Sequence, residues 1–102
     1  MDTTDSNLNI GLAIKSIRSI YDMRSKELAQ NLDISPSYLS EIETGRKTIS
    51  FQLLTKFSQY FKLKPSTVIL IAESIAEMKE TNESKIDSQN KIMKIIITSH
   101  GE

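Results

Sequence analysis

The chain contains no cysteine and no tryptophan, and it has only three glycines and two prolines among its 102 residues. The absence of cysteine excludes a disulfide framework and thiolate metal sites. So few glycines and prolines leave little room for an all-β architecture, which needs many tight turns. With 38% hydrophobic and 25% charged residues, the composition fits one globular domain with one modest core.

Long apolar runs are absent as well. The longest are residues 68–72 and 95–97, far short of the roughly 20 residues that span a bilayer. The N-terminus is acidic and polar, so it does not resemble a signal peptide. We therefore expect a cytoplasmic protein with no membrane segment.

Neither sign of charge is in excess, since 13 Lys and Arg residues balance 13 Asp and Glu residues. Whole-protein charge sets the non-specific attraction to a polyanion. Any nucleic-acid role must therefore depend on a local basic patch.

The sequence offers little support for catalysis. Its one histidine, His100, lies two residues from the C-terminus and is typical of a solvated tail residue. There is no glycine-rich phosphate loop and no metal-ligand spacing. Carboxylates that recur every three to four residues indicate a solvated helix face rather than a metal site, and these are Glu73, Glu77, Glu80 and Glu83. We expect no catalytic residue, no metal and no cofactor.

The most informative stretch is residues 35–47, which carries a helix start, a helix stop and a basic tail. Ser35 is a favourable N-cap, and Pro36 stands at the first helical position, where its missing N–H costs nothing. Gly45 supplies the left-handed residue that ends a helix. Between them, Leu39 and Ile42 form an apolar pair on the inward face of the helix. The outward face is polar and carries Ser37, Tyr38, Ser40 and Glu41. A helix this short must be held by its neighbours.

Apolar periodicity predicts helices on both sides of that stretch, from Asn9 to about Asp22, over residues 26–32, over 51–61 and over 65–79. Ser50 is a second favourable N-cap, before the helix over 51–61. The two short helices around residue 34 are joined so tightly that they must cross steeply, as in a helix-turn-helix. The fourth helix carries an aromatic stripe that we expect to be the main buried surface of the core: Phe51, Leu54, Phe57 and Phe61.

The remaining segments define the predicted domain organisation. Residues 1–8 have almost no apolar content and are expected to be a disordered tail. Residues 9–79 form the main domain, and residues 80–102 are an extension that is helical and dimerising. Residues 84–97 fit a helix with Ile86, Met93 and either Ile96 or Ile97 on one face, although the β-branched run at 95–98 fits a strand equally well. We favour the helix.

The fifth helix has more apolar surface than one side of a small bundle needs. Its seam consists of Val68, Ile71, Ile75 and Met78. Together with the Ile-rich C-terminal segment, this seam is the candidate homodimer surface. Ordinary core packing is the alternative.

From Ile10 to about Leu70, the order and spacing of these residues resemble the Cro/CI-type (XRE family) helix-turn-helix domain of phage repressors and bacterial regulators. The resemblance lies in Ile10-Gly11, Ile14, Ile17-Arg18, Glu27-Leu28-Ala29, Leu32, Ile34-Ser35, Tyr38 to Lys47, and Phe51, Leu54 and Phe57. It implies an all-α, five-helix, lambda-repressor-like domain, here with a C-terminal helical extension. In that family the third helix lies in the DNA major groove.

The resemblance implies a sequence-specific, repressor-like transcriptional regulator of bacterial or phage origin. Its partner is double-stranded DNA, bound by a homodimer on a palindromic operator in the nucleoid. An antitoxin or antirepressor-like protein-binding module that retains the fold is the alternative, motivated by the zero net charge and by Glu41.

The family pattern also implies roles for individual residues. Base or sugar contacts fall to Ser37, Tyr38 and Glu41. Phosphate contacts fall to Lys26, Arg46 and Lys47, assisted by Ser25 and Thr48. The complete predicted DNA-binding set is Ser25, Lys26, Ser35, Pro36, Ser37, Tyr38, Ser40, Glu41, Arg46, Lys47 and Thr48. Arg18 and Glu43 are expected to form a structural ion pair between the first and third helices.

Overall fold

The computed structural model describes residues 3–100, with side chains from Ser6 onward, and within this range it is entirely helical. The helices are α1 (Thr3–Ile20), α2 (Ser25–Leu32), α3 (Pro36–Glu43), α4 (Phe51–Tyr60), α5 (Pro65–Thr81) and α6 (Lys85–His100). The predicted all-α fold, five helices plus a C-terminal helix, is therefore confirmed.

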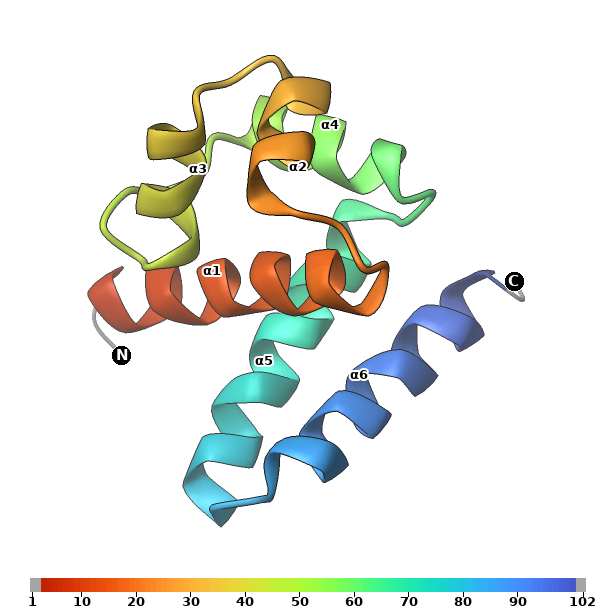
Figure 1. Ribbon diagram of the computed structural model, residues 1–102. Helices are drawn as coiled ribbons and strands as arrows, with labels where there is room; N and C mark the ends of the chain where they lie inside the picture. The colour runs from red at the N-terminus through yellow and green to blue at the C-terminus, as the bar shows by residue number, and fades with distance from the viewer. Residues whose placement is uncertain (1–2, 101–102) are drawn as a thin grey trace.

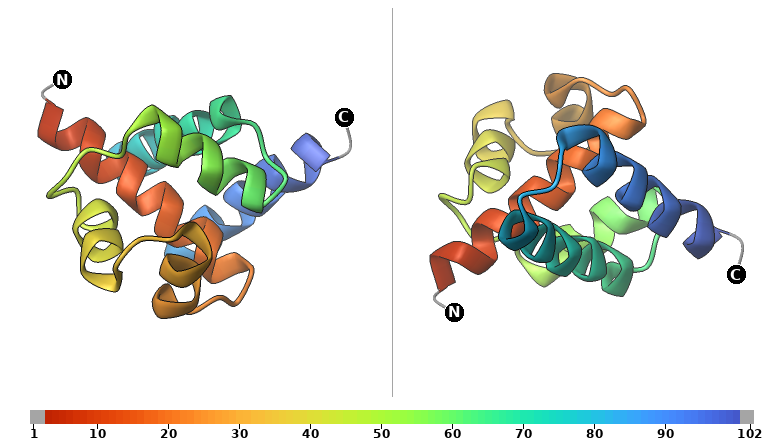
Figure 2. Two further views of the ribbon diagram at one scale, coloured as in Figure 1. Left: turned by 90° about the horizontal axis from the view of Figure 1, so that it is seen from above. Right: turned by 90° about the horizontal axis from the view of Figure 1, so that it is seen from below.

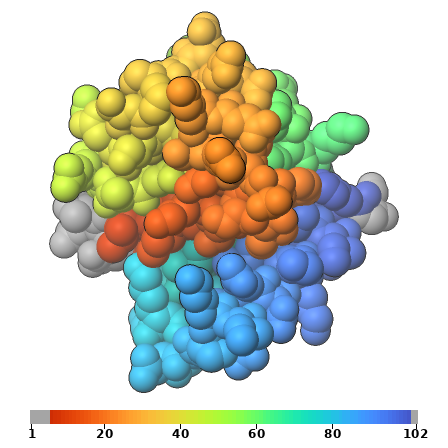
Figure 3. All heavy atoms as spheres, in the orientation of Figure 1, coloured from red at the N-terminus to blue at the C-terminus, as the bar shows by residue number. Residues whose placement is uncertain are grey.

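Helix α1 crosses the middle of the molecule and separates two groups of helices (Figures 1 and 2). The α2–α3 unit and α4 lie on one side of α1, while α5 and α6 lie on the other. Helix α1 packs against α3, α5 and α6, and its outer face remains visible as a band between the two groups in the space-filling view (Figure 3). One core cluster draws side chains from all six helices.

Five of the helices end in the same way. The first or second residue after each has a positive φ, and these residues are Asp22, Asp33, Gly45, Lys62 and Asn82. The next amide then bonds back over the last turn, as when the N–H of Arg46 donates to the Glu41 carbonyl at 2.9 Å. This Schellman closure satisfies carbonyls that a helix end leaves open, and it reverses the chain within a few residues.

The predicted N-caps are confirmed at two helices. The hydroxyl of Ser35 accepts from the N–H of Tyr38 at 3.0 Å, and the hydroxyl of Ser50 accepts from the N–H of Leu53 at 3.1 Å. Pro36 and Pro65 stand in the first turns of α3 and α5.

The prediction of a disordered tail over residues 1–8 is wrong from Thr3 onward, because this segment begins α1. Residues 1 and 2 lie outside the described range. A Cβ added to Gly45 would come within 2.8 Å of the Cα of Leu8, so the start of α1 lies directly against the loop after α3. A contact between positions so far apart in sequence leaves no trace in local composition.

The aromatic stripe of α4 is buried except at its first member. Leu54, Phe57 and Phe61 lie in the core, but Phe51 is 74% exposed. The prediction for Phe51 is wrong, because this residue lies in the first turn at the edge of the buried face. Ser58 completes that face instead, and its hydroxyl donates to the Leu54 carbonyl at 2.7 Å.

The seam on α5 is core rather than a free surface. Val68, Ile71, Ile75 and Met78 are all buried within the chain itself. Helices α1 and α6 cover α5, so the prediction that these four residues form a dimer surface is wrong. The alternative of ordinary core packing holds.

Residues 85–100 form a helix, as we favoured, and not a strand. Ile92 and Ile96, one helical turn apart, are buried in the shared core, so packing overrides the β-branched preference of the Ile run. The hydroxyls of Thr67 and Ser99 are 3.1 Å apart. His100 is more than a solvated tail residue, since its Nε2 lies 3.2 Å from the Phe61 carbonyl oxygen.

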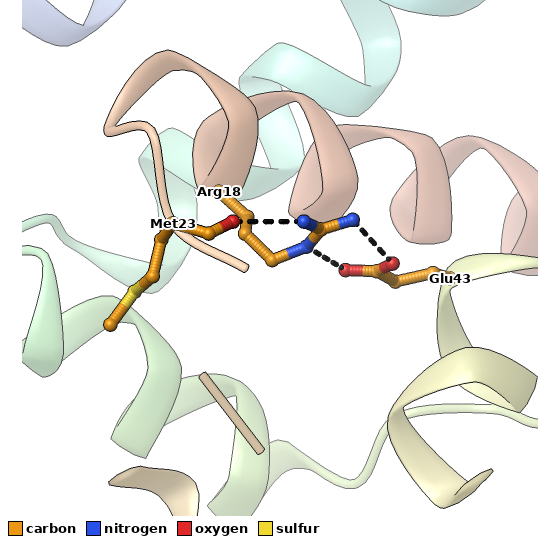
Figure 4. A network of polar contacts seen from close by, with 3 residues as sticks. All are labelled: Arg18, Met23 and Glu43. Atoms are coloured by element: carbon orange, nitrogen blue, oxygen red, sulfur yellow. Dashed lines mark hydrogen bonds and ion pairs between the residues drawn. The ribbon is translucent and has the colours of Figure 1, made fainter. Parts of the chain in front are cut away.

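The predicted ion pair between α1 and α3 is present (Figure 4). The Arg18 guanidinium donates to both carboxylate oxygens of Glu43, at 2.8 and 3.1 Å, and to the Met23 carbonyl at 2.9 Å. The side chains of Arg18 and Glu43 are only 14% and 7% exposed. One side chain thus joins α1, the turn after it and the C-terminal end of α3.

Gly11 allows α1 and α3 to approach closely beside this ion pair. A Cβ at position 11 would lie 2.3 Å from the Ile42 carbonyl oxygen and 2.7 Å from that of Glu43. Both atoms belong to backbone, so any side chain here must push the two helices apart.

Breaking the ion pair should destabilise the fold strongly. We expect Arg18→Met or Glu43→Gln to lower the free energy of unfolding by about 3–5 kcal/mol, because each leaves a buried group without its partner. The double variant Arg18→Met/Glu43→Leu should recover most of that loss in urea denaturation. The matched control is Glu41→Gln on the same helix, which removes an exposed ion pair worth less than about 1 kcal/mol. Equal losses in the single variants and the control would contradict this prediction.

Gly11→Ala should also destabilise the protein, by about 1–3 kcal/mol, because the methyl group overpacks the α1–α3 contact. Thermal unfolding measures the effect, and Ser19→Ala on the exposed side of α1 is the control, expected to change stability by less than about 0.5 kcal/mol. An unchanged or raised melting temperature for Gly11→Ala would show that the two helices are not in close contact.

Candidate nucleic-acid interface

The helix-turn-helix unit is held together from behind by apolar side chains. Leu28, Ala29 and Leu32 of α2 are buried in one core with Leu39 and Ile42 of α3. The connection between the two helices is three residues long. The orientation of α3 is therefore fixed by the packing of its inner face, and its outer face is not needed to hold the fold together.

Lys56 adds a support that was not predicted from the sequence. Its Nζ donates to the Leu32 carbonyl at 2.8 Å, so α4 stabilises the C-terminal end of α2. No sequence pattern points to this bond, because the two residues are 24 positions apart and belong to helices in different motifs.

The outer face of α3 presents the polar residues that the sequence predicted. Pro36, Ser37 and Ser40 are exposed, and Tyr38 and Glu41 are half-buried. The Thr44 hydroxyl at the end of the helix donates to the Ser40 carbonyl at 2.9 Å. This face is short, and its side chains are mostly small.

The structure brings three of the predicted site residues together. Lys47 Nζ lies 5.7 Å from the centre of the Tyr38 ring and 3.7 Å from Glu41 Oε2. The Schellman closure at Gly45 turns the chain back, so Lys47 folds over the helix that precedes it. All three residues belong to the predicted DNA-binding set, but their mutual contact cannot be read from the sequence, since a residue beyond a helix stop has no helical spacing to its partners.

The other predicted residues flank α3 on two segments. Ser25 and Lys26 open α2 and are exposed, and Arg46 and Thr48 are exposed in the loop after α3. Arg24, which precedes α2, is extended and makes no side-chain capping bond. The first amides of α2 and its positive dipole end therefore face outward beside Lys26.

Among residues 6–100, whose side chains the structure describes, no group of three or more His, Asp or Glu is placed to hold a metal ion. Among the described helices, none is both long enough and apolar enough to cross a membrane.

Comparison with known proteins points to one family. A helix-turn-helix family model matches residues 14–68, more than half of the chain. An uncharacterised HTH-type transcriptional regulator from Archaeoglobus fulgidus is 41% identical over 49 residues, which are 48% of this chain and 21% of that protein. The chain thus spans about a fifth of the length of this curated relative.

Solved structures agree with that match. One crystal structure of the clp gene regulator ClgR from Corynebacterium glutamicum is 26% identical and covers 95% of this chain and 96% of its own, with a TM-score of 0.70. Another ClgR structure, from C. glutamicum, is 32% identical over 67% of this chain and 88% of its own, with a TM-score of 0.63. The chain therefore belongs to the XRE-type helix-turn-helix family of DNA-binding transcriptional regulators.

Proposed function

We propose that this protein is a sequence-specific regulator that places α3 in the DNA major groove and binds a palindromic operator as a homodimer. It acts as a repressor where that operator overlaps a promoter, and it works in the cytoplasm beside the chromosome. The observation that carries the proposal is the polar outer face of α3, supported rigidly from behind and flanked by two basic segments.

The dimensions of α3 suit the major groove. The groove is about 12 Å wide and accepts one helix, whose N-terminal residues reach the base edges. Ser37, Tyr38 and Glu41 stand on the outer face of α3, with Pro36 and Ser40 beside them. A carboxylate accepts from cytosine N4, so Glu41 favours a cytosine within the half-site.

Phosphate contacts come from the flanking segments. Lys26 and Ser25 lie at the open N-terminus of α2, a position that attracts anions. Arg46, Lys47 and Thr48 lie in the loop on the other side of α3. Contacts on both sides would set the register of α3 in the groove while carrying no sequence information themselves.

A dimer follows from the small size of α3. With 8 residues, it touches only a few base pairs, too few to specify one site in a genome. A two-fold dimer doubles the readout, and its half-sites are separated by whole helical turns of DNA. Selection of bound fragments from genomic DNA, followed by footprinting, tests this directly, with a two-fold symmetric footprint as the expected result.

Binding should weaken steeply with salt. Three cations per protomer, Lys26, Arg46 and Lys47, give a dimer with about six neutralised phosphates and a log–log slope near −5. Arg46→Ala should lower the affinity for every sequence and reduce the slope by about 1 per protomer. Fluorescence anisotropy on a labelled operator at several salt concentrations measures both.

The control is Lys64→Ala, at an exposed lysine just before α5, which should leave affinity and slope unchanged. A flat salt response together with no bound genomic fragment would reject the DNA proposal. It would favour the protein-binding alternative, for which Glu41 and the zero net charge are the motivation.

Glu41 should restrict binding to the correct sequence. Glu41→Gln removes a charge that repels phosphates and releases Lys47, so we expect affinity for random DNA to rise by about three- to tenfold. The ratio of operator to random affinity should fall, because the cytosine contact is weakened. Competition binding with both DNAs gives this ratio. A variant that binds random DNA no better than the parent protein would show that Glu41 does not face the DNA.

A further inference from the structure

Helix α6 carries apolar residues on two different faces. Ile92 and Ile96 face inward and are buried in the core. Ile86, Met93 and Ile97 face outward and are 72%, 42% and 63% exposed. Single exposed apolar side chains are common on protein surfaces, but here three share one 16-residue helix.

The exposed residues lie along one line of the helix. Ile86, Asn90, Met93 and Ile97 are separated by four, three and four positions, the spacing of a single helical stripe. We call these four residues the outer stripe. It spans residues 86–97, about 16 Å of the helix at 1.5 Å per residue.

The outer stripe reads the same in both directions. A spacing of four, three and four is symmetric about its midpoint, between Lys91 and Ile92. If a second copy of α6 packs antiparallel on the first, Ile86 therefore meets Ile97 of the second copy, and Asn90 meets Met93. A two-fold dimer requires this kind of self-complementary surface.

The charges beside the stripe fit the same arrangement. Asp87 and Lys94 are both exposed on one flank of the outer stripe. Two-fold symmetry brings that flank against itself, so Asp87 comes within about 3 Å along the axis of the level of Lys94 in the second copy. Two equivalent ion pairs can form, one at each end of the interface.

Asn90 gives this interface a defined register. It is the one polar residue of the outer stripe, and symmetry brings it beside Asn90 of the second copy, offset by about 4.5 Å along the axis. Two amides at that distance can hydrogen bond with each other, which favours this register. A polar residue in an apolar helix seam fixes alignment in this way.

We propose that two copies of this chain associate through antiparallel packing of their outer stripes on α6. The interface lies on the opposite side of α1 from α3, so it leaves the candidate DNA face uncovered (Figures 1 and 3). One helix per copy gives a small interface, and the dimer should dissociate on dilution. The inference rests on the homodimer part of the proposed function and replaces the α5 seam as its surface.

The first test is sedimentation equilibrium of the full chain without DNA over a wide range of concentration. We expect a monomer–dimer equilibrium that approaches twice the 11.5 kDa chain mass. Ile97→Glu should raise the dissociation constant at least about tenfold, with an unchanged far-ultraviolet circular dichroism spectrum because the side chain is exposed. The control Phe51→Glu changes a more exposed apolar residue on α4 and should have no effect.

The second test reverses the flanking charges. Asp87→Lys and Lys94→Asp should each weaken the dimer by about three- to tenfold, because each places like charges together. The double variant Asp87→Lys/Lys94→Asp should return the dissociation constant to within about twofold of the parent value. Failure of the double variant to recover would overturn the predicted pairing.

The third test fixes the direction of packing, and the absence of native cysteine makes it simple. Asn90→Cys should form an intermolecular disulfide under mild oxidation, because it lies near the two-fold axis. Ile86→Cys should not, since its two copies lie about 16 Å apart along an antiparallel pair. Cross-linking of Ile86→Cys alone would mean parallel packing and would overturn the proposal.

A monomer at every concentration, a dimer that Ile97→Glu does not weaken, or larger open assemblies would also overturn it. These outcomes are separate from failure of DNA binding. Arg46→Ala should dimerise normally even where it loses DNA affinity. If Ile97→Glu is monomeric yet binds the operator as tightly as the parent protein, only the link between dimer and operator fails.

Discussion

The contact between α1 and the C-terminal end of α3 is the constraint on which the rest of the structure depends. Arg18 donates to both carboxylate oxygens of Glu43 through Nε and Nη2, and its Nη1 donates to the Met23 carbonyl. Gly11 removes the one side chain that would keep the two helices apart. An 8-residue helix has no stability of its own, so this contact determines the direction in which the outer face of α3 points.

The way in which the helices end explains why the chain contains so few glycines. Five chain reversals use the Schellman closure, yet only Gly45 among their left-handed residues is a glycine. Asp22, Asp33 and Asn82 tolerate this conformation better than most residues, and Lys62 adopts it at some cost. Gly45 has a second reason to lack a side chain, since the backbone of Leu8 lies against it. Few glycines are therefore needed to fold a chain with many reversals.

Features that depend on neighbouring residues were predicted correctly from the sequence. The caps at Ser35 and Ser50 and the stop at Gly45 are examples, because their partners lie within one or two turns. The Arg18–Glu43 ion pair was predicted from family resemblance, and its geometry is as expected. The surface position of the candidate DNA-binding residues was likewise predicted from local sequence signals and from the family resemblance.

Features that depend on the partner of a face were not predicted. The seam on α5 was recognised as apolar, but its period is the same whether α1, α6 or a second chain covers it. Phe51 fits the stripe of α4 and is nevertheless exposed, since spacing does not show where the covering helices end. The contact of Lys47 with Tyr38 and Glu41 was missed for a related reason, because the loop that creates it breaks the helical period.

The arrangement about α1 also bears on how the protein can act with zero net charge. Glu43 is neutralised by Arg18 inside the structure, and the exposed carboxylates Glu73, Glu77 and Glu80 belong to α5, on the other side of α1 from α3. Salt screens charges beyond about 8–10 Å, so those distant carboxylates contribute little to the potential at α3. Glu41 is the acid that remains within reach of Lys47, and it is therefore the charge that most directly opposes an anion at this face.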